Sequence, residues 1–165
     1  TINGTTGSIT PVTQDNVSSS NIFSIPIVGS ANCGEASIFA SENVEGYLQI
    51  SAKLLDRSKA DGLFALTPQG DSMDNSQVKG GPIRSGDYVV VDRNDRSPRN
   101  GDYIVSVIDG MANIKKYWLD TINSRVVLVS ESKHDLPPIF IHEDDNYLIN
   151  GKVVQVVKPF RANAV

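Results

Sequence analysis

Ser72 lies in the sequence GDSM, directly after a glycine and an aspartate that are typical of a turn. A serine hydroxyl attacks a carbonyl efficiently only when a neighbouring group removes its proton. Three arrangements can do this: a histidine oriented by a carboxylate, a metal-activated water, or a lysine in its neutral form. Which of them the chain can supply decides the chemistry that is open to Ser72.

The histidine and metal arrangements find little support in this sequence. Both histidines, His134 and His142, lie in the late stretch SKHDLPPIFIHED, where the neighbouring charges favour exposed side chains over a general base. The chain has a single cysteine, Cys33, and its spacing from the two histidines matches no zinc site. We therefore expect no metal and no other cofactor.

Two adjacent lysines, Lys115 and Lys116, lie in the strand-like sequence MANIKKYWL. A lysine base must be neutral, so its pKa must fall from about 10.4, and burial among apolar groups has this effect. Neighbours on a strand point to opposite faces, so one lysine can be buried while the other stays in water. Alternation alone places Lys116 with Ala112, Ile114 and Trp118 and favours its burial. Two exposed lysines on an edge strand are the simpler interpretation.

The elements that must position these residues are nearly all strand-like. Asp109-Gly110 suits a two-residue hairpin turn of type I′, and Pro26 favours an edge position for the first strand. The segment 52–62 predicts one short helix that ends at Gly62. The fold class is therefore mainly β, a twisted and partly closed sheet system with little helix. The expected strands cover residues 21–29, 42–51, 63–68, 87–92, 102–108, 111–119, 125–130, 138–142 and 147–159.

Two similar corners occur in this pattern, RSGDYVVVD from Arg84 and RNGDYIVSVID from Arg99. In each corner a glycine precedes an aspartate at the start of a strand. We expect the glycine to adopt a positive φ angle and the aspartate to accept a hydrogen bond within its own turn.

The 165 residues suit one globular domain, with 39% hydrophobic and 21% charged residues. The net charge of −4 and the absence of a helix–turn–helix pattern argue against direct DNA contact by this piece. A single cysteine allows no internal disulfide and suits a reducing cytoplasm. The sequence has no apolar run long enough to cross a bilayer and no secretory signal, so no membrane association is expected.

The chain begins with threonine, which favours a fragment or processed product of a longer protein. The Ser-, Thr-, Asn- and Gly-rich residues 1–21 predict a linker or N-terminal arm. Residues 22–160 then form the domain, and residues 161–165 form a C-terminal tail.

Several segments, taken in order, resemble the LexA-like self-cleaving family, or peptidase S24 family. This family includes the repressor LexA, lambda-type phage repressors and the mutagenesis protein UmuD, and it shares its fold and catalytic pair with signal peptidases. The similar segments are IPIVGSANCGEA and VEGYLQI, then GDSM, IRSGDYVVVD, NGDYIVSVIDGMANIKKY and GKVVQVVKP. Together they cover roughly residues 22–159.

The resemblance implies that Ser72 is the nucleophile. The family's lysine stands second in a V-K-R/K pattern, which matches Ile114-Lys115-Lys116 and selects Lys115, against the strand alternation. Since the base lies in a cleft that the cleavage segment covers, a polar neighbour such as Asn113 is acceptable there.

The resemblance also implies a cut in the chain itself, between Cys33 and Gly34, where the family has Ala-Gly or Cys-Gly. Backbone amides, including that of Ser72, would hold the oxyanion, with Asp71 and Met73 supporting the turn. The loop between Ser72 and Gly86 is longer than the compact version in LexA, which leaves the catalytic residues unchanged but could alter regulation.

The function implied is that of the C-terminal domain of a LexA-like or phage repressor. Such a domain forms homodimers and cleaves itself when a RecA-type filament binds, which lifts repression in the DNA-damage (SOS) response or induces a prophage. Operator DNA would be bound only through an upstream helix–turn–helix domain. The late strands, including GKVVQVVKPF, offer a candidate edge for the dimer surface.

Three alternatives stay open from the sequence. A UmuD-like polymerase accessory subunit would use self-cleavage to change its partners. A signal peptidase would act on other chains, although a membrane segment is missing. A non-catalytic β domain would serve dimerisation alone, although Ser72 and Lys115 are both intact.

Overall fold

The computed structural model describes residues 21–29, 44–142, 144–145 and 147–162. In these residues, nine strands form one open sheet in the order β2-β1-β3-β4-β9-β5-β6-β7-β8. The predicted mainly β class with little helix is confirmed. The elements are β1 (Ile22–Val28), β2 (Val44–Ser51), α3 (Ala52–Leu55), β3 (Leu63–Leu66), β4 (Tyr88–Asp92), β5 (Tyr103–Ile108), β6 (Met111–Asp120), β7 (Arg125–Val129), β8 (Ile139–His142) and β9 (Tyr147–Val157).

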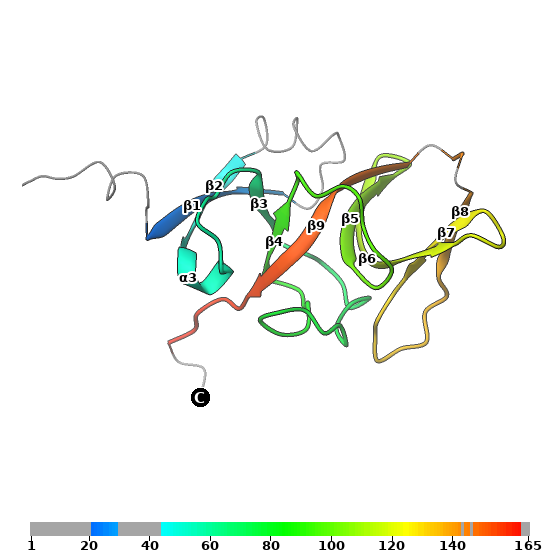
Figure 1. Cartoon of the computed structure of the whole chain (residues 1–165). Coiled ribbons are helices and arrows are strands. Elements are labelled where there is room, and N and C mark those ends of the chain that lie inside the picture. Colours follow the sequence, from blue (N-terminus) through cyan, green and yellow to red (C-terminus); the bar gives the residue numbers. More distant parts are fainter. Residues whose placement is uncertain (1–20, 30–43, 143, 146, 163–165) are drawn as a thin grey trace, which may run out of the picture.

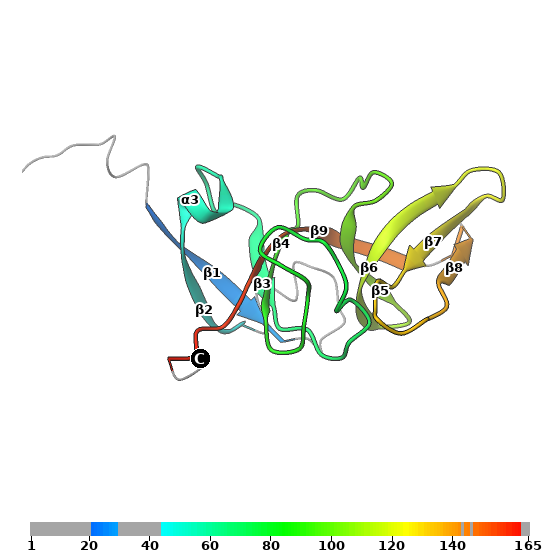
Figure 2. The same ribbon diagram turned by 90° about the horizontal axis from the view of Figure 1, so that it is seen from below.

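The sheet is elongated, with β1 and β2 at one end and β7 and β8 at the other (Figure 1). The long strand β9 crosses the middle and pairs with β4 on one side and β5 on the other. Strands β1 and β3 pair in parallel, while the other strand pairs of the described residues are antiparallel. The segment between β3 and β4 lies on one side of the sheet and faces the viewer in Figure 2.

Both predicted corners are confirmed. Gly86 and Gly101 have φ angles of 89° and 94°, in the left-handed region that favours glycine. The aspartate after each glycine accepts a hydrogen bond from the backbone N–H three residues earlier, at 2.8 Å for Asp87 and 2.9 Å for Asp102. The hairpin between β5 and β6 has positive φ at both central residues, Asp109 and Gly110, as a type I′ turn requires.

The expected extent of the helix was wrong, and the expected edge position of the first strand holds only in part. The helix is a single turn, because Asp56 adopts the left-handed conformation (φ 55°, ψ 45°) directly after Leu55 and ends the helix before Gly62. Strand β1 lies between β2 and β3 in the strand order, but β3 pairs with it only at Ile27 and Val28. Pro26 therefore has a strand partner only on the β2 side, an edge-like position that suits a proline.

In the strand order, β9 lies between β4 and β5. It pairs with β4 through residues 152–157 and with β5 through residues 147–152, so each half of the strand has one of these neighbours and Lys152 alone pairs with both. The late strands as a dimer surface stay a prediction. The described strands at the two ends of the sheet are β2 and β8.

The hydrophobic core under the β3–β4 segment combines residues from distant parts of the chain. Met73 and Ile83, from this segment, are buried against Phe64 and the valines of β4 and β9. The segment is also hydrogen-bonded to β9, since the Val156 N–H donates to the Lys79 carbonyl at 2.8 Å. This packing fixes the loop that carries Ser72 against the centre of the sheet. Among the described residues, no helix has the length and apolar character needed to cross a membrane.

Candidate active site

Ser72 lies in a turn just beyond the end of β3, and both sides of the turn are anchored. Before Ser72, Gly70 has a φ angle of 92°, and its N–H donates to the Ser85 hydroxyl at 2.9 Å. After Ser72, the Met73 side chain is buried in the core with 3% exposure. The Asp74 N–H reaches back to the Asp71 carbonyl at 3.3 Å, which closes the turn around the serine. The hydroxyl of Ser72 is therefore presented from a short, fixed loop.

Lys115 reaches this hydroxyl from β6. Its Nζ donates a hydrogen bond to Ser72 Oγ at 3.0 Å, across 43 residues of sequence. Burial lowers the pKa of Lys115 below its usual value. Within the described residues Lys115 forms no ion pair with a carboxylate, so no opposite charge there offsets the cost of burying its charge. The arrangement favours a neutral amine that can accept the proton of Ser72.

The neighbouring Lys116 has a different environment. Its Nζ lies 3.2 Å from Glu131 Oε2 and 5.5 and 5.9 Å from the ring centres of Tyr103 and Trp118. An ion pair with flanking aromatic faces stabilises an ammonium group. Alternation correctly placed Ala112 and Ile114 against the core, but the lysine on their face is ion-paired and does not contact Ser72.

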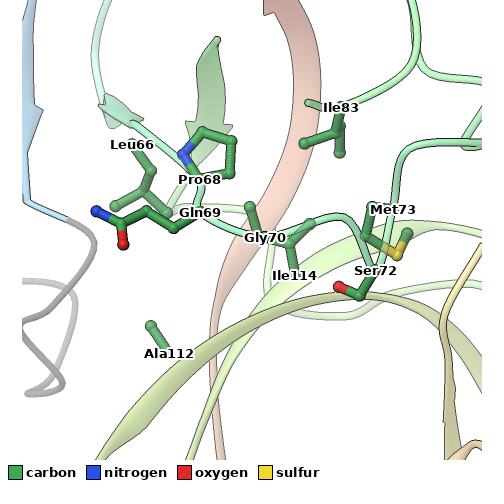
Figure 3. Close-up of a pocket in the computed structure, with 9 residues that line it drawn as sticks. All are labelled: Leu66, Pro68, Gln69, Gly70, Ser72, Met73, Ile83, Ala112 and Ile114. Carbon is green, nitrogen blue, oxygen red and sulfur yellow. The ribbon is translucent and has the colours of Figure 1, made fainter. Parts of the chain in front are cut away.

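A pocket of about 300 Å³ opens beside Ser72 (Figure 3). Its walls come from the end of β3, the segment between β3 and β4, and β6. They expose polar and apolar surface in similar amounts, and among the described residues no charged side chain lines them. Such a pocket suits an extended segment with small or apolar side chains rather than a charged ligand. The lining residues are Leu66, Pro68, Gln69, Gly70, Ser72, Met73, Ile83, Ala112 and Ile114.

The remaining predicted site residues have separate outcomes. Cys33 and Gly34 lie outside the described residues. Asp71 is exposed, with its carboxylate 3.4 Å from the Nε2 of the exposed His134. His142 lies near Asp144, at 3.8 Å, and neither histidine has a contact with Ser72.

Sequence reasoning missed Glu131 and Tyr103. The Tyr103 hydroxyl donates a short hydrogen bond to Glu131 Oε1, and the Glu131 backbone contacts the Ser72 loop. Glu131 lies outside the strands and outside every segment that carried the family resemblance, so no local signal marked it. In the described part of the chain, no group of three His, Cys, Asp or Glu side chains is placed to hold a metal ion.

Comparison with known proteins gives a consistent result. The family model Peptidase S24-like matches residues 26–154, which include both Ser72 and Lys115. The chain is 36% identical over 140 residues to the LexA repressor of Geobacillus kaustophilus, covering 84% of this chain and 60% of that protein. It is 32% identical over 140 residues to the LexA repressor of Carboxydothermus hydrogenoformans, covering 84% of this chain and 62% of that protein.

A third relative, the LexA repressor of Oleidesulfovibrio alaskensis, is 35% identical over 133 residues, which cover 81% of this chain and 58% of that protein. The chain thus spans about three fifths of the length of these relatives. The mainly β fold and the turn that carries Ser72 agree with this comparison. Because the family model covers most of the chain, the chain belongs to the Peptidase S24-like family and is a LexA-like member of it.

Proposed function

We propose that this chain is the self-cleaving, dimerising C-terminal domain of a LexA-like transcriptional repressor. Ser72 acts as the nucleophile, Lys115 as the general base, and the bond between Cys33 and Gly34 as the substrate. The observation that carries this proposal is the 3.0 Å hydrogen bond between Lys115 Nζ and Ser72 Oγ at a lysine whose pKa is lowered by burial.

The course of the chain supports an intramolecular substrate. Strand β1 ends at Val28, which pairs with Leu66, a residue of the pocket wall, and with Val44 at the start of β2. Val28 and Val44, which flank the part of the sequence that contains Cys33, are therefore partners in the sheet, and Val28 lies beside the pocket wall. Cys33 follows Val28 by five residues, a reach of up to about 17 Å for an extended chain. Holding substrate and nucleophile in one chain contributes much of the rate by proximity.

The reaction proceeds in two stages. Neutral Lys115 accepts the proton of Ser72 as Oγ attacks the Cys33 carbonyl carbon, and backbone amides including that of Ser72 stabilise the oxyanion. The carbon–nitrogen bond to Gly34 then breaks, and Lys115 returns the proton to the departing amine. A water molecule, deprotonated by Lys115, attacks the acyl ester and releases Cys33 as a free carboxylate.

The relatives, which are LexA repressors, support a regulatory role for this chain. We place a DNA-binding domain upstream of this chain, with cleavage separating it from the dimerising part. A homodimer matches the two-fold symmetry of an operator, so cleavage weakens DNA binding. A RecA-type filament in the cytoplasm would favour the state in which the cleavage segment occupies the pocket, as expected for the DNA-damage response.

The test is self-cleavage of the purified chain, followed by intact mass between neutral and alkaline pH. Fragments that end at Cys33 and begin at Gly34 are expected. The rate should rise about tenfold per pH unit below the pKa of Lys115, because only the neutral lysine is a base.

Three variants are compared with the parent chain: Ser72→Ala, Lys115→Ala and Lys116→Ala. The first two should abolish cleavage and the third should retain it, with circular dichroism confirming that all three are folded. Cleavage that survives in Ser72→Ala, or that is lost in Lys116→Ala but not in Lys115→Ala, would contradict the assignment. A folded parent chain that stays intact even with an activated recombinase filament would instead be a binding module.

A further inference from the structure

Glu131 lies two residues after the end of β7. The segment around it is hydrogen-bonded to the residues that follow Ser72. Its backbone N–H donates to Met73 Sδ at 3.4 Å, and its carbonyl accepts from the Asn75 N–H at 2.8 Å. Two residues further on, the Lys133 N–H donates to Asp74 Oδ1 at 3.0 Å. These contacts attach the three residues after Ser72 to the segment after β7.

The Glu131 side chain connects the same loop to two strands. One carboxylate oxygen accepts from the Tyr103 hydroxyl on β5, and the other lies 3.2 Å from Lys116 Nζ on β6. The Tyr103 hydroxyl also accepts from the Gln77 N–H of the Ser72 loop, at 3.0 Å. Tyr103 and Lys116 are themselves register partners in the sheet. One half-buried carboxylate, with 25% of its side chain exposed, thus joins the loop, β5 and β6.

The ion pair also affects the charge near the general base. Lys116 is the chain neighbour of Lys115, and its ammonium is balanced by the Glu131 carboxylate. Burial and the hydrogen bond to Glu131 raise the pKa of Tyr103, so its hydroxyl keeps its proton as the pH rises into the alkaline range. The hydrogen bond from the Tyr103 hydroxyl to Glu131 therefore persists as the pH rises into this range.

We propose that Glu131 is a positioning residue for the cleavage reaction, which holds the Ser72 loop against β5 and β6 and balances the charge of Lys116 beside the general base. This inference rests on the proposed function, because it assigns a role in the same reaction. Glu131 does not touch the reacting atoms and acts through Met73, Tyr103 and Lys116.

The sign of the electrostatic effect can be derived from the contacts. Glu131→Gln keeps the size of the side chain but leaves the Lys116 ammonium unbalanced, so protonated Lys115 becomes less favourable and its pKa falls. Lys116→Met leaves the Glu131 carboxylate unbalanced, so protonated Lys115 becomes more favourable and its pKa rises. Besides Lys115, the titratable groups on β5, β6 and β7 are Tyr103, Lys116, Tyr117, Asp120 and Arg125, with Asp120 paired to Arg125 at 2.8 Å. Glu131 follows β7, and Asp71, Asp74, Lys133 and His134 lie in or beside the Ser72 loop.

The experiment measures the self-cleavage rate of the full chain against pH for Glu131→Gln, Lys116→Met and Tyr103→Phe. The midpoint of the pH profile should move to lower pH in the first variant and to higher pH in the second. Tyr103→Phe should leave the midpoint unchanged, since it removes no charge. The plateau rate at high pH should fall about tenfold or more in Glu131→Gln and Tyr103→Phe, because a displaced Ser72 loop misaligns the reacting atoms.

Asp135→Asn is the matched control, since it converts an exposed carboxylate in the same segment to an amide. It should leave both the midpoint and the plateau at the parent values. Urea unfolding of every variant separates a loss of rate from a loss of fold.

The inference is overturned if the parent chain cleaves but the Glu131→Gln and Lys116→Met midpoints both stay at the parent value or move in the same direction. A parent chain that does not cleave, or a Ser72→Ala chain that does, contradicts the proposed function instead. In that case, lysine side-chain NMR still titrates Lys115 in the variants. The same pair of opposite shifts is expected there, and its absence would refute the role of Glu131.

Discussion

Gly80 is the residue through which the long loop after Ser72 packs on the centre of the sheet, and its replacement by alanine tests this packing. Gly80 has a φ angle of 98°, and a Cβ atom there would lie 2.0 Å from the Val156 carbonyl oxygen and 2.6 Å from Gln155 Nε2. The carbonyl belongs to β9, which pairs with β4 at this position (Val89 with Val156), so it cannot move without disturbing that pairing. The substitution must therefore push the loop away from β9.

Three contributions set the expected loss of stability. The left-handed backbone conformation costs alanine about 1–2 kcal/mol. Overpacking against a fixed carbonyl costs about 1–3 kcal/mol. Losing the hydrogen bond from the Val156 N–H to the Lys79 carbonyl, which is 2.8 Å long, costs about 1 kcal/mol. We expect Gly80→Ala to lower the free energy of unfolding by roughly 4 kcal/mol, a large share of the 5–15 kcal/mol typical of a domain.

Gly86→Ala is the matched control. Gly86 has a similar φ angle of 89°, but its added Cβ would have no neighbour within 4 Å. This variant should lose only the backbone contribution of about 1–2 kcal/mol. Urea unfolding followed by the fluorescence of the single tryptophan, Trp118, gives both free energies by linear extrapolation. If the two variants differed by less than about 0.5 kcal/mol, the loop would not be fixed on β9 as the contacts indicate.

Two further predictions concern charged groups. The lowered pKa of Lys115 means that the folded state is penalised at any pH below the folded pKa, and that the penalty disappears as pH rises through the folded pKa towards the unfolded value of about 10.4. Lys115→Met should therefore stabilise the chain more at neutral pH than above about pH 10, because the penalty is present only while the folded lysine is charged. Urea unfolding at both pH values measures this difference, and an equal gain at both would refute the sign. In the same assay, Asp87→Ala should lower the free energy of unfolding by about 3 kcal/mol and Asp102→Ala by about 1 kcal/mol. The reason is burial, since the Asp87 side chain is 5% exposed beside Lys158 whereas the Asp102 side chain is 19% exposed. Equal losses in the two variants would contradict this difference.

The β character of the chain and the shapes of its turns could be predicted from the sequence because both depend on neighbouring residues. Alternating apolar residues marked the strands, and the two Gly-Asp corners each contain a positive φ angle and a local hydrogen bond to the aspartate. Local rules were less reliable for the helix, because Asp56 adopted a conformation that few residues other than glycine favour. The arm over residues 1–21, the tail over residues 161–165 and the cut at Cys33 stay predictions.

The choice between the two lysines shows what local sequence patterns could determine and what they could not. It determined that Ser72 lies in a turn and that Lys115 and Lys116 lie on a strand, and alternation assigned them to opposite faces. The family resemblance selected Lys115 against this alternation, but only the tertiary structure gives the physical reason: a carboxylate from beyond β7 pairs with Lys116, and Lys115 is left buried beside Ser72. Glu131 and Met73 are 58 residues apart, and β9 pairs in the interior of the sheet with strands far from it in sequence. Contacts of this kind depend on how the whole chain packs, so no periodicity within one segment can encode them.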